Sequence, residues 1–350
     1  MTATLFDLIA GSWLSKSIAV AARLGIADVL GTGPKAADEI AATVGANPDA
    51  LLRLLRLLAS QQVFALDAEG RFLNSPLSEQ LRTEHALSLR YFFILSGEEY
   101  YDAWGRMMHT MTTGQSAFPA VFGGSIYEHM ATHPETARVY DLAMRDLARP
   151  VGYLLARQHD FSDAETIVDI GGGAGEVLMQ VLAVHVSARG ICFDRSDVCA
   201  RAMDDGRNDP NVCARLEFRP GDFFVEVPAG GNVYLLKNVL HNWNDDACVT
   251  ILTNIAQVLR ATRPAPSGRP PRLLVIEPVV EKDSRSPQHL MNALFQMVIC
   301  QDGTRERTLA LFAALLERAG LRMIDSQALP TGHSVIVCVA IDALSTPAEI

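Results

Sequence analysis

Three side chains suited to acid–base chemistry lie in the second half of the chain: His241, Glu277 and Glu306. An imidazole can accept a proton near neutral pH, and carboxylates can orient it and stabilise its protonated form. His241 follows the run LLKNVL, and Glu277 ends the run LLVIE. Glu306 lies in a polar stretch, residues 302–307, just before a helical pattern. A lone histidine is more often structural than catalytic, but two available carboxylates favour His241 as a general base.

A glycine turn at residues 166–175, TIVDIGGGAG, is the element that must position a ligand beside these residues. Its β-branched start predicts a buried strand, its glycines allow a sharp bend, and the apolar spacing that follows predicts a helix. A ligand could approach the bare backbone at Gly171 and Gly173. The dinucleotide pattern G-x-G-x-x-G would need a glycine where Glu176 stands, so NAD is disfavoured. Alone, such a turn could also serve packing.

Two further segments favour a nucleoside ligand. Asp194 ends the next predicted strand, nineteen residues after Gly175, where a carboxylate can accept hydrogen bonds from both hydroxyls of a ribose. Asp222 and Phe223 follow the third strand and offer a carboxylate for an exocyclic amine and an aromatic face for a purine. Taken alone, the second segment could be only a turn.

Strands and helices alternate from Thr166 onward, which predicts a doubly wound α/β sheet. Ligands of such sheets bind outside the carboxyl ends of the strands, so Asp194, Lys237 and Glu277 should lie at one edge. The further predicted strands are 189–194, 216–219, 232–237, 272–277, 321–325 and 334–339.

The N-terminal part is predicted to be mostly helical. Residues 5–30 are apolar at helical spacing, and residues 36–44 and 49–61 followed by strands at 63–66 and 71–73 outline a winged helix. This fold can bind DNA or serve dimerisation. Residues 35–90 hold six Lys or Arg against seven Asp or Glu, a poor balance for binding phosphates. Dimerisation is therefore favoured.

Helical segments continue to about residue 157 and are rich in aromatic and methionine side chains, which can line pockets for flat organic molecules. His129 and His133 are spaced four apart, but Pro134 follows and no third ligand is spaced to join them, so no metal site is predicted.

Composition restricts the partners and the compartment. The 350 residues are 49% hydrophobic and 20% charged, as in ordinary globular proteins, and a net charge of −10 argues against nucleic acid or anionic membranes as partners. The six cysteines form no C-x-x-C pair, which suits a reducing cytoplasm. Charged residues interrupt the apolar N-terminus too early for a signal peptide.

Taken in order, six motifs resemble those of S-adenosylmethionine-dependent O-methyltransferases of the plant caffeic acid type and their bacterial relatives in natural-product biosynthesis. The resemblance spans nearly the whole chain. The motifs are VDIGGGAG at 168–175, FD at 193–194, PGDFF at 220–224, LLKNVLHNW at 235–243, LLVIEP at 273–278 and RERT at 305–308.

The resemblance implies a role for each matching residue. His241 would be the base, with Glu277 and Glu306 hinging or orienting it. The implied cofactor residues are Asp169, Gly171, Gly173, Asp194, Asp222, Phe223 and Lys237, and the implied substrate residues are Tyr140, Met144, Met297 and Gln301. The lack of a metal-ligand cluster fits the metal-independent branch. Asn242 departs from the family, which commonly has aspartate after the base.

The resemblance also implies the domain order and the reaction. A winged-helix dimerisation domain (1–90) and a helical linker with substrate-pocket residues (91–157) would precede a Rossmann-like methyltransferase domain (158–350), in a homodimer. The expected activity is methyl transfer from S-adenosylmethionine to a hydroxyl of an aromatic or polyketide-like molecule in antibiotic or other secondary metabolism. The alternatives are a relative with hydroxylase, decarboxylase or pericyclase chemistry, an N-methyltransferase and a winged-helix regulator.

Overall fold

A computed structural model describes residues 5–204, 209–265, 267–282 and 284–341. The chain forms two compact units. The first contains Met1–Asp102 and His133–Leu147, and the second contains Ala103–Thr132 and Ala148–Ile350. Helix α11 (Pro134–Gln158) begins in the first unit and ends in the second. None of the described helices has the length and the apolar character needed to cross a membrane.

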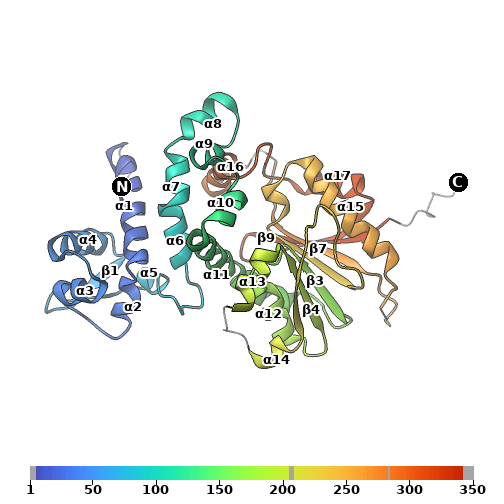
Figure 1. Cartoon of the computed structure of the whole chain (residues 1–350), viewed down its shortest axis with the longest axis horizontal. Helices are drawn as coiled ribbons and strands as arrows, with labels where there is room; N and C mark the ends of the chain where they lie inside the picture. The colour runs from blue at the N-terminus through green and yellow to red at the C-terminus, as the bar shows by residue number, and fades with distance from the viewer. Residues whose placement is uncertain (1–4, 205–208, 266, 283, 342–350) are drawn as a thin grey trace. The chain divides into compact units, whose positions relative to one another are not determined.

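The first unit contains the winged-helix outline that the sequence predicts (Figure 1). Strands β1 and β2 pair antiparallel after the two helices α3 and α4, and Lys35 adds a bridge to Phe72. Asn47 caps α4 by accepting a hydrogen bond from the Ala50 N–H group, and Pro48 occupies the first turn. The elements are α1 (Leu5–Arg23), α2 (Ile26–Leu30), α3 (Ala37–Val44), α4 (Pro48–Ser60), β1 (Phe64–Leu66), β2 (Phe72–Asn74), α5 (Pro76–Glu79) and α6 (Arg90–Gly97).

The N-terminal apolar stretch is two helices, not one continuous helix over residues 5–30. Gly25 has a left-handed backbone, with φ of 69°, and separates α1 from α2. Arg90 stabilises this break because its guanidinium donates to the Ala22 carbonyl at 3.0 Å and pairs with Asp28 at 2.5 Å. Periodicity could not reveal the break, because the apolar pattern continues through it.

The second unit contains a seven-stranded sheet of order β5-β4-β3-β6-β7-β9-β8. The first five strands in this order are parallel, and β9 runs antiparallel to both β7 and β8. This architecture confirms the predicted doubly wound fold. The strands are β3 (Thr166–Ile170), β4 (Arg189–Asp194), β5 (Leu216–Pro220), β6 (Val233–Lys237), β7 (Arg272–Pro278), β8 (Leu321–Ala328) and β9 (His333–Ala340).

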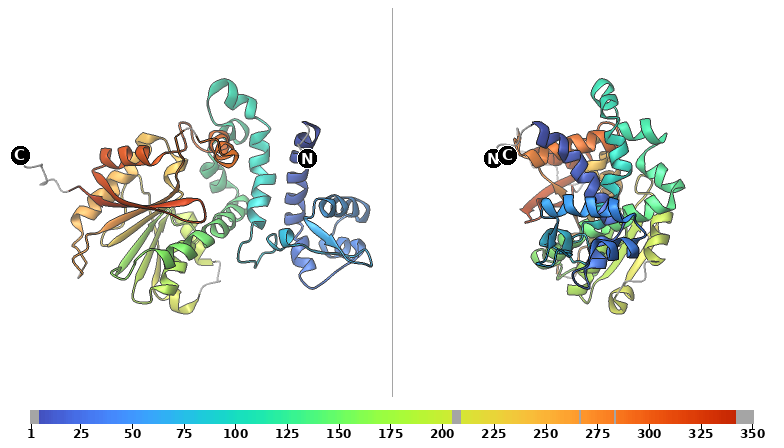
Figure 2. Two further views of the ribbon diagram at one scale, coloured as in Figure 1. Left: turned by 180° about the vertical axis from the view of Figure 1, so that it is seen from behind. Right: turned by 90° about the vertical axis from the view of Figure 1, so that its left-hand side faces the viewer.

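Helices cover both faces of this sheet (Figure 2). Neighbouring residues of β3 alternate between the two cores, with Val168 facing α15 and α17 and Ile167 facing α12 and the end of α11. The helices of this unit are α8 (Met107–Thr113), α9 (Ala117–Phe122), α10 (Ile126–Thr132), α12 (Glu176–Val184), α13 (Ser196–Asp204), α14 (Pro210–Cys213), α15 (Asp245–Ala261), α16 (Pro287–Ile299) and α17 (Leu309–Arg318), while α7 (Glu99–Trp104) crosses the boundary between the units.

The predicted strands differ from the observed ones mainly at their ends. Strand β6 begins at Val233, one residue later than predicted, although the Asn232 backbone already bonds to Thr166 and Arg272 of the neighbouring strands. Strand β8 continues to Ala328. The carboxyl ends of the parallel strands still lie at one edge, which brings the predicted chemistry together.

Candidate active site

His241 is held by a direct hydrogen bond to Glu277. The imidazole Nδ1 lies 2.7 Å from Glu277 Oε2, and Oε1 of the same carboxylate accepts the Leu240 N–H group at 2.8 Å. Glu277 is fully buried, whereas the His241 side chain is 23% exposed. A carboxylate can only accept from Nδ1–H, so this pairing leaves Nε2 as the nitrogen that can take a proton from a substrate.

A strained turn carries His241. After β6 the chain adopts a positive φ of 55° at Asn238, which is uncommon for a residue other than glycine, and His241 then lies in the short 3₁₀ helix η1 (Leu240–Asn242). Two contacts hold the turn. His333 Nε2 lies 3.0 Å from Asn238 Oδ1, and Asn242 Nδ2 donates to the Asn238 carbonyl at 3.2 Å. Burial, with repulsion from Lys237, lowers the pKa of His333 to about 4, so this second histidine is neutral.

The donated bond of Asn242 gives its amide a specific role. An aspartate at this position, as is common in the resembled family, could not donate to the Asn238 carbonyl. The Asn242 Oδ1 atom also accepts a weak bond from the Cys300 thiol at 3.5 Å. Asn242 therefore lacks the negative charge of an aspartate but donates a hydrogen bond that closes the turn.

Arg307 fixes the same turn from the other side. Its side chain is 1% exposed, and it donates at 2.8 Å to the carbonyls of Leu240 and Trp243, which flank His241. Its charge is balanced by Asp245 at 2.9 Å. Because Arg307 follows Glu306 directly, one buried guanidinium connects the segment of Glu306 to the turn of His241.

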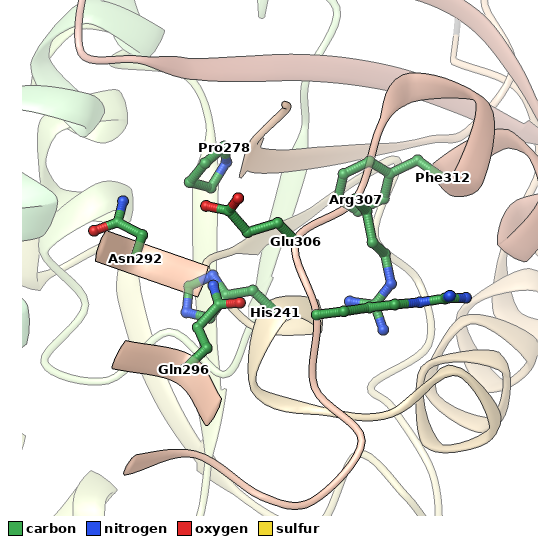
Figure 3. Close-up of a pocket in the computed structure, with 8 residues that line it drawn as sticks. His241, Pro278, Asn292, Gln296, Glu306, Arg307 and Phe312 are labelled. Carbon is green, nitrogen blue, oxygen red and sulfur yellow. The ribbon is translucent and has the colours of Figure 1, made fainter. Parts of the chain in front are cut away.

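A pocket lies between these segments, and His241 and Glu306 both line it (Figure 3). Burial raises the pKa of Glu306, and the nearby His289 partly offsets this effect. Glu306 makes no hydrogen bond to His241 within the described ranges, so only Glu277 orients the ring directly. The remaining lining residues are Pro278, Asn292, Gln296, Arg305, Arg307 and Phe312.

The glycine turn lies next to the turn of His241. Strands β3 and β6 are neighbours, and a Cβ atom at Gly171 would come within 2.9 Å of the Val239 side chain. Gly171 and Gly173 both have positive φ, of 70° and 58°. A Cβ at Gly173 would meet nothing within 4 Å, so this part of the backbone faces open space. The turn therefore leaves room for a ligand close to the histidine.

Two ionisable residues adjoin the glycine turn, the buried Asp169 and the partly buried Lys237. Asp169 is 1% exposed, and its Oδ2 has no hydrogen-bond partner in the described parts of the chain. Desolvation raises the pKa of Asp169 to about 7, although the charge of Lys237 opposes the shift. Desolvation likewise lowers the pKa of Lys237 to about 8. An unpaired buried carboxylate suits a cationic ligand group, so Asp169 fits the predicted cofactor.

Asp194 and Asp222 have different surroundings. Asp194 accepts the N–H groups of Gly173 at 2.8 Å and Arg195 at 2.7 Å, one on each oxygen, and burial raises its pKa. Each carboxylate oxygen can accept a second bond, so a diol remains a feasible ligand. Asp222 is exposed and accepts the Phe224 N–H group at 2.8 Å.

An aromatic cluster extends from Phe223, which is the only one of its members predicted from sequence to contact the ligand. The Phe223 ring meets Trp243 edge to face at 6.0 Å, and Trp243 stacks on Tyr127 at 5.8 Å with planes 12° apart. Phe224 also packs on Trp243. Such rings suit a flat ligand. Tyr127 lies far from the other motifs in sequence, so no local pattern indicated its place here.

The four residues implied for substrate binding are divided between the two units, and their role stays a prediction. Tyr140 and Met144 lie on the part of α11 that belongs to the first unit. Met297 and Gln301 belong to the second unit but do not line the pocket of His241. The pocket instead contains Asn292 and Gln296, whose spacing of four residues on α16 could have indicated a shared face.

No group of three or more His, Cys, Asp or Glu side chains that could hold a metal ion occurs in residues 5–204, 209–265, 267–282 and 284–341. His129 packs against the rings of Phe118 and Phe122. It therefore has a packing role in the second unit, whereas His133 belongs to the first.

Comparisons with known proteins are consistent with this site. The family model for an O-methyltransferase domain matches residues 104–322, and the model for an O-methyltransferase dimerisation domain matches residues 6–84. The chain is 36% identical to the phenazine O-methyltransferase PhzM of Lysobacter antibioticus over 97% of this chain and 96% of that protein. It is 34% identical to the 3-amino-4-hydroxybenzoate 4-O-methyltransferase of Streptomyces cremeus over 93% of this chain and 87% of that protein.

One solved structure that is similar to this chain contains bound ligands. The O-methyltransferase NcsB1 from neocarzinostatin biosynthesis, in complex with S-adenosylmethionine and 2-hydroxy-5-methyl naphthoic acid, superposes with a TM-score of 0.73 at 29% identity, over 93% of this chain and 95% of that one. These findings confirm the predicted family and fold class. The chain therefore belongs to the S-adenosylmethionine-dependent O-methyltransferase family, with an N-terminal dimerisation domain, and is an O-methyltransferase.

Proposed function

We propose that this enzyme methylates a hydroxyl group of an aromatic or polyketide-like small molecule in secondary metabolism, with His241 as the general base. The observation that carries the proposal is the 2.7 Å pairing of His241 Nδ1 with the buried Glu277, in a turn that lies beside the glycine loop. The relatives named above act, by their names, on phenazine and hydroxybenzoate compounds, and the neighbour binds a naphthoic acid.

His241 would assist by removing the proton of the acceptor hydroxyl. A phenol titrates near ~10 and a histidine near ~6.5, so full deprotonation before methyl transfer is uphill. A base positioned to take the proton during transfer typically contributes about 10²- to 10⁴-fold in rate. The negative charge of Glu277 stabilises the imidazolium that forms, and Glu306 provides a second carboxylate in the same pocket. This role for Glu306 is electrostatic.

The cofactor residues that we propose are those of the glycine turn and the neighbouring strand ends. When bound, S-adenosylmethionine supplies a methyl group on an electrophilic sulfonium. Gly173 leaves the backbone open, Gly171 lets the turn pack closely against Val239, and the unpaired Asp169 oxygen suits a positive charge. Asp194 would accept the ribose hydroxyls. The adenine would meet Asp222 and Phe223, and Lys237 completes the proposed set.

For the acceptor we propose Tyr140, Met144, Met297 and Gln301 as contacts, on the strength of the family resemblance. The same resemblance supports domains at 1–90, 91–157 and 158–350.

Proton removal by His241 needs no metal ion. Six free thiols support a location in the reducing cytoplasm.

We further propose that the enzyme is a homodimer assembled through its N-terminal domain. The matched dimerisation domain supports this assembly. On α1, large apolar side chains are exposed by 58% or more, which is unusual for a surface without a partner. They are Leu5, Phe6, Leu8, Ile9 and Trp13. Light scattering should give twice the chain mass, and Trp13→Glu should shift the species toward one chain mass.

Incubation of the enzyme with methyl-labelled S-adenosylmethionine and a panel of hydroxyarenes tests the reaction. The proposal requires label in an aryl methyl ether and one S-adenosylhomocysteine released per product. Product without S-adenosylhomocysteine would favour hydroxylase, decarboxylase or pericyclase chemistry. Label on nitrogen, located by mass spectrometry, would identify an N-methyltransferase.

A further inference from the structure

Gln296 presents a buried amide to the pocket of His241. The residue lies on α16, is 9% exposed, and lines the pocket together with His241 and Glu306. Its Oε1 atom is buried and has no hydrogen-bond partner in the parts of the chain that the structure describes. Figure 3 shows the Gln296 side chain reaching from the helix toward the imidazole.

An unpartnered buried amide oxygen is unfavourable for the protein alone. Burial removes the hydrogen bonds that water would make, and no protein group replaces them. Side chains that bury a polar atom without a hydrogen-bond partner concentrate at functional sites. A ligand that donates to Oε1 would satisfy the amide.

The pocket restricts where that donor must lie. Glu277 occupies Nδ1 of His241, so Nε2 is the ring nitrogen left for the acceptor hydroxyl, and His241 and Gln296 line the same pocket. Asn292 lies one helical turn before Gln296 on the same wall, and its amide already accepts from Gln288 at 3.2 Å. Of these two amides, Gln296 is the one whose buried oxygen has no partner in the described parts of the chain.

We infer that Gln296 is a specificity residue that accepts a hydrogen bond from an amino or hydroxyl substituent on the ring carbon next to the methylated hydroxyl. The preferred acceptors would be ortho-aminophenols and ortho-diphenols, on a ring system of unspecified size. This inference rests on the proposed function, because it assumes that His241 deprotonates an aromatic hydroxyl. It adds the substituent pattern that the acceptor must carry.

Matched acceptor pairs test the inference with the full-length enzyme. The pairs are 2-aminophenol with 2-methylphenol, and 1-amino-2-naphthol with 1-methyl-2-naphthol, each assayed with labelled S-adenosylmethionine for wild type, Gln296→Leu and Gln257→Leu. Gln257 is an exposed residue of α15, so the control makes the same chemical change outside the pocket. For each variant, the kcat/KM for the amino-bearing acceptor is divided by the kcat/KM for its methyl-bearing partner. Comparing this ratio between variants cancels the intrinsic reactivity of the acceptors.

Gln296→Leu should reduce the preference for the amino-bearing acceptor by about 10- to 100-fold, because the site loses the group that recognises the donor. Gln257→Leu should leave it unchanged. Since no protein hydrogen bond is lost, the thermal midpoint of Gln296→Leu should equal or exceed that of wild type. If Gln296→Leu still formed aryl methyl ethers and kept the wild-type preference for the amino-bearing acceptor, the inference would be wrong and the proposed function would stand. If wild type methylated none of the four acceptors on oxygen, the proposed function would fail with it.

Discussion

The carboxylate of Glu277 contacts both the side chain of His241 and the backbone of its turn. One oxygen lies 2.7 Å from His241 Nδ1, and the other accepts the Leu240 N–H group at 2.8 Å. Because the group is fully buried, it cannot exchange these partners for water. Glu277 therefore couples the orientation of the imidazole to the conformation of its turn, which Arg307, Asn242 and His333 also stabilise.

Glu277→Gln should reduce kcat by about 10³-fold or more. The backbone N–H group would retain the amide oxygen, so the NH₂ group would face His241 Nδ1 and force the proton onto Nε2. The nitrogen facing the substrate would then have no lone pair to accept a proton. Rapid-quench measurement of methyl transfer checks this, with S-adenosylhomocysteine affinity as the control. A loss below about tenfold would contradict the tautomer argument.

Arg307→Lys should lower kcat by about 10- to 100-fold, with a small change in KM. Lysine retains the charge but cannot donate simultaneously to Leu240, Trp243 and Asp245 in the fixed geometry of a guanidinium.

Arg305→Lys is the matched control for Arg307→Lys, because Arg305 also pairs with Asp245 but is half exposed and donates to neither carbonyl. We expect it to retain at least half of the wild-type rate. Equal effects of the two substitutions on kcat would show that the carbonyl contacts are unimportant.

Asp194→Asn should weaken S-adenosylhomocysteine binding by about 10- to 100-fold, since hydrogen bonds to a charged acceptor are worth about 1.5–3 kcal/mol. Isothermal titration calorimetry measures this directly. Asp197→Asn provides a control, because Asp197 pairs with Arg195 and Arg201 on the neighbouring helix. An affinity for Asp194→Asn that matches the control would disprove the ribose role.

Asp169 predicts a pH dependence of stability. Its pKa is raised from 3.8 to about 7 by burial, so between these values the folded protein holds a proton that the unfolded chain has lost. The stabilisation is complete below pH ~3.8 and is lost as the pH rises through about 7. Ligand-free Asp169→Asn should therefore gain thermal stability relative to wild type from pH 5 to pH 8. Parallel midpoints across this range would contradict the shift.

The sequence predicted the strand ends that carry the site because the relevant residues follow unambiguous apolar runs. Lys237 ends β6 and Glu277 is the last residue but one of β7, and a parallel sheet places such ends together. The pairing of His241 with Glu277 could be anticipated for the same reason. The domain boundaries and the assigned roles remain predictions.

Other features depend on contacts between segments that are distant in sequence. Arg90 bonds to the chain at the break near Gly25, and Arg307 reaches back more than sixty residues to the Leu240 carbonyl in the turn of His241. The exposure of Gln296 to the pocket depends on how α16 packs. No local spacing encodes these contacts, so only the folded structure reveals them.

The most direct test of the central claim is the rate of methyl transfer by His241→Ala at saturating S-adenosylmethionine, measured together with its affinity for S-adenosylhomocysteine. We predict a loss of about 10²- to 10⁴-fold in rate with affinity within twofold of wild type. A variant that retains its rate, or that loses mainly its affinity, would contradict the assignment of His241 as the base.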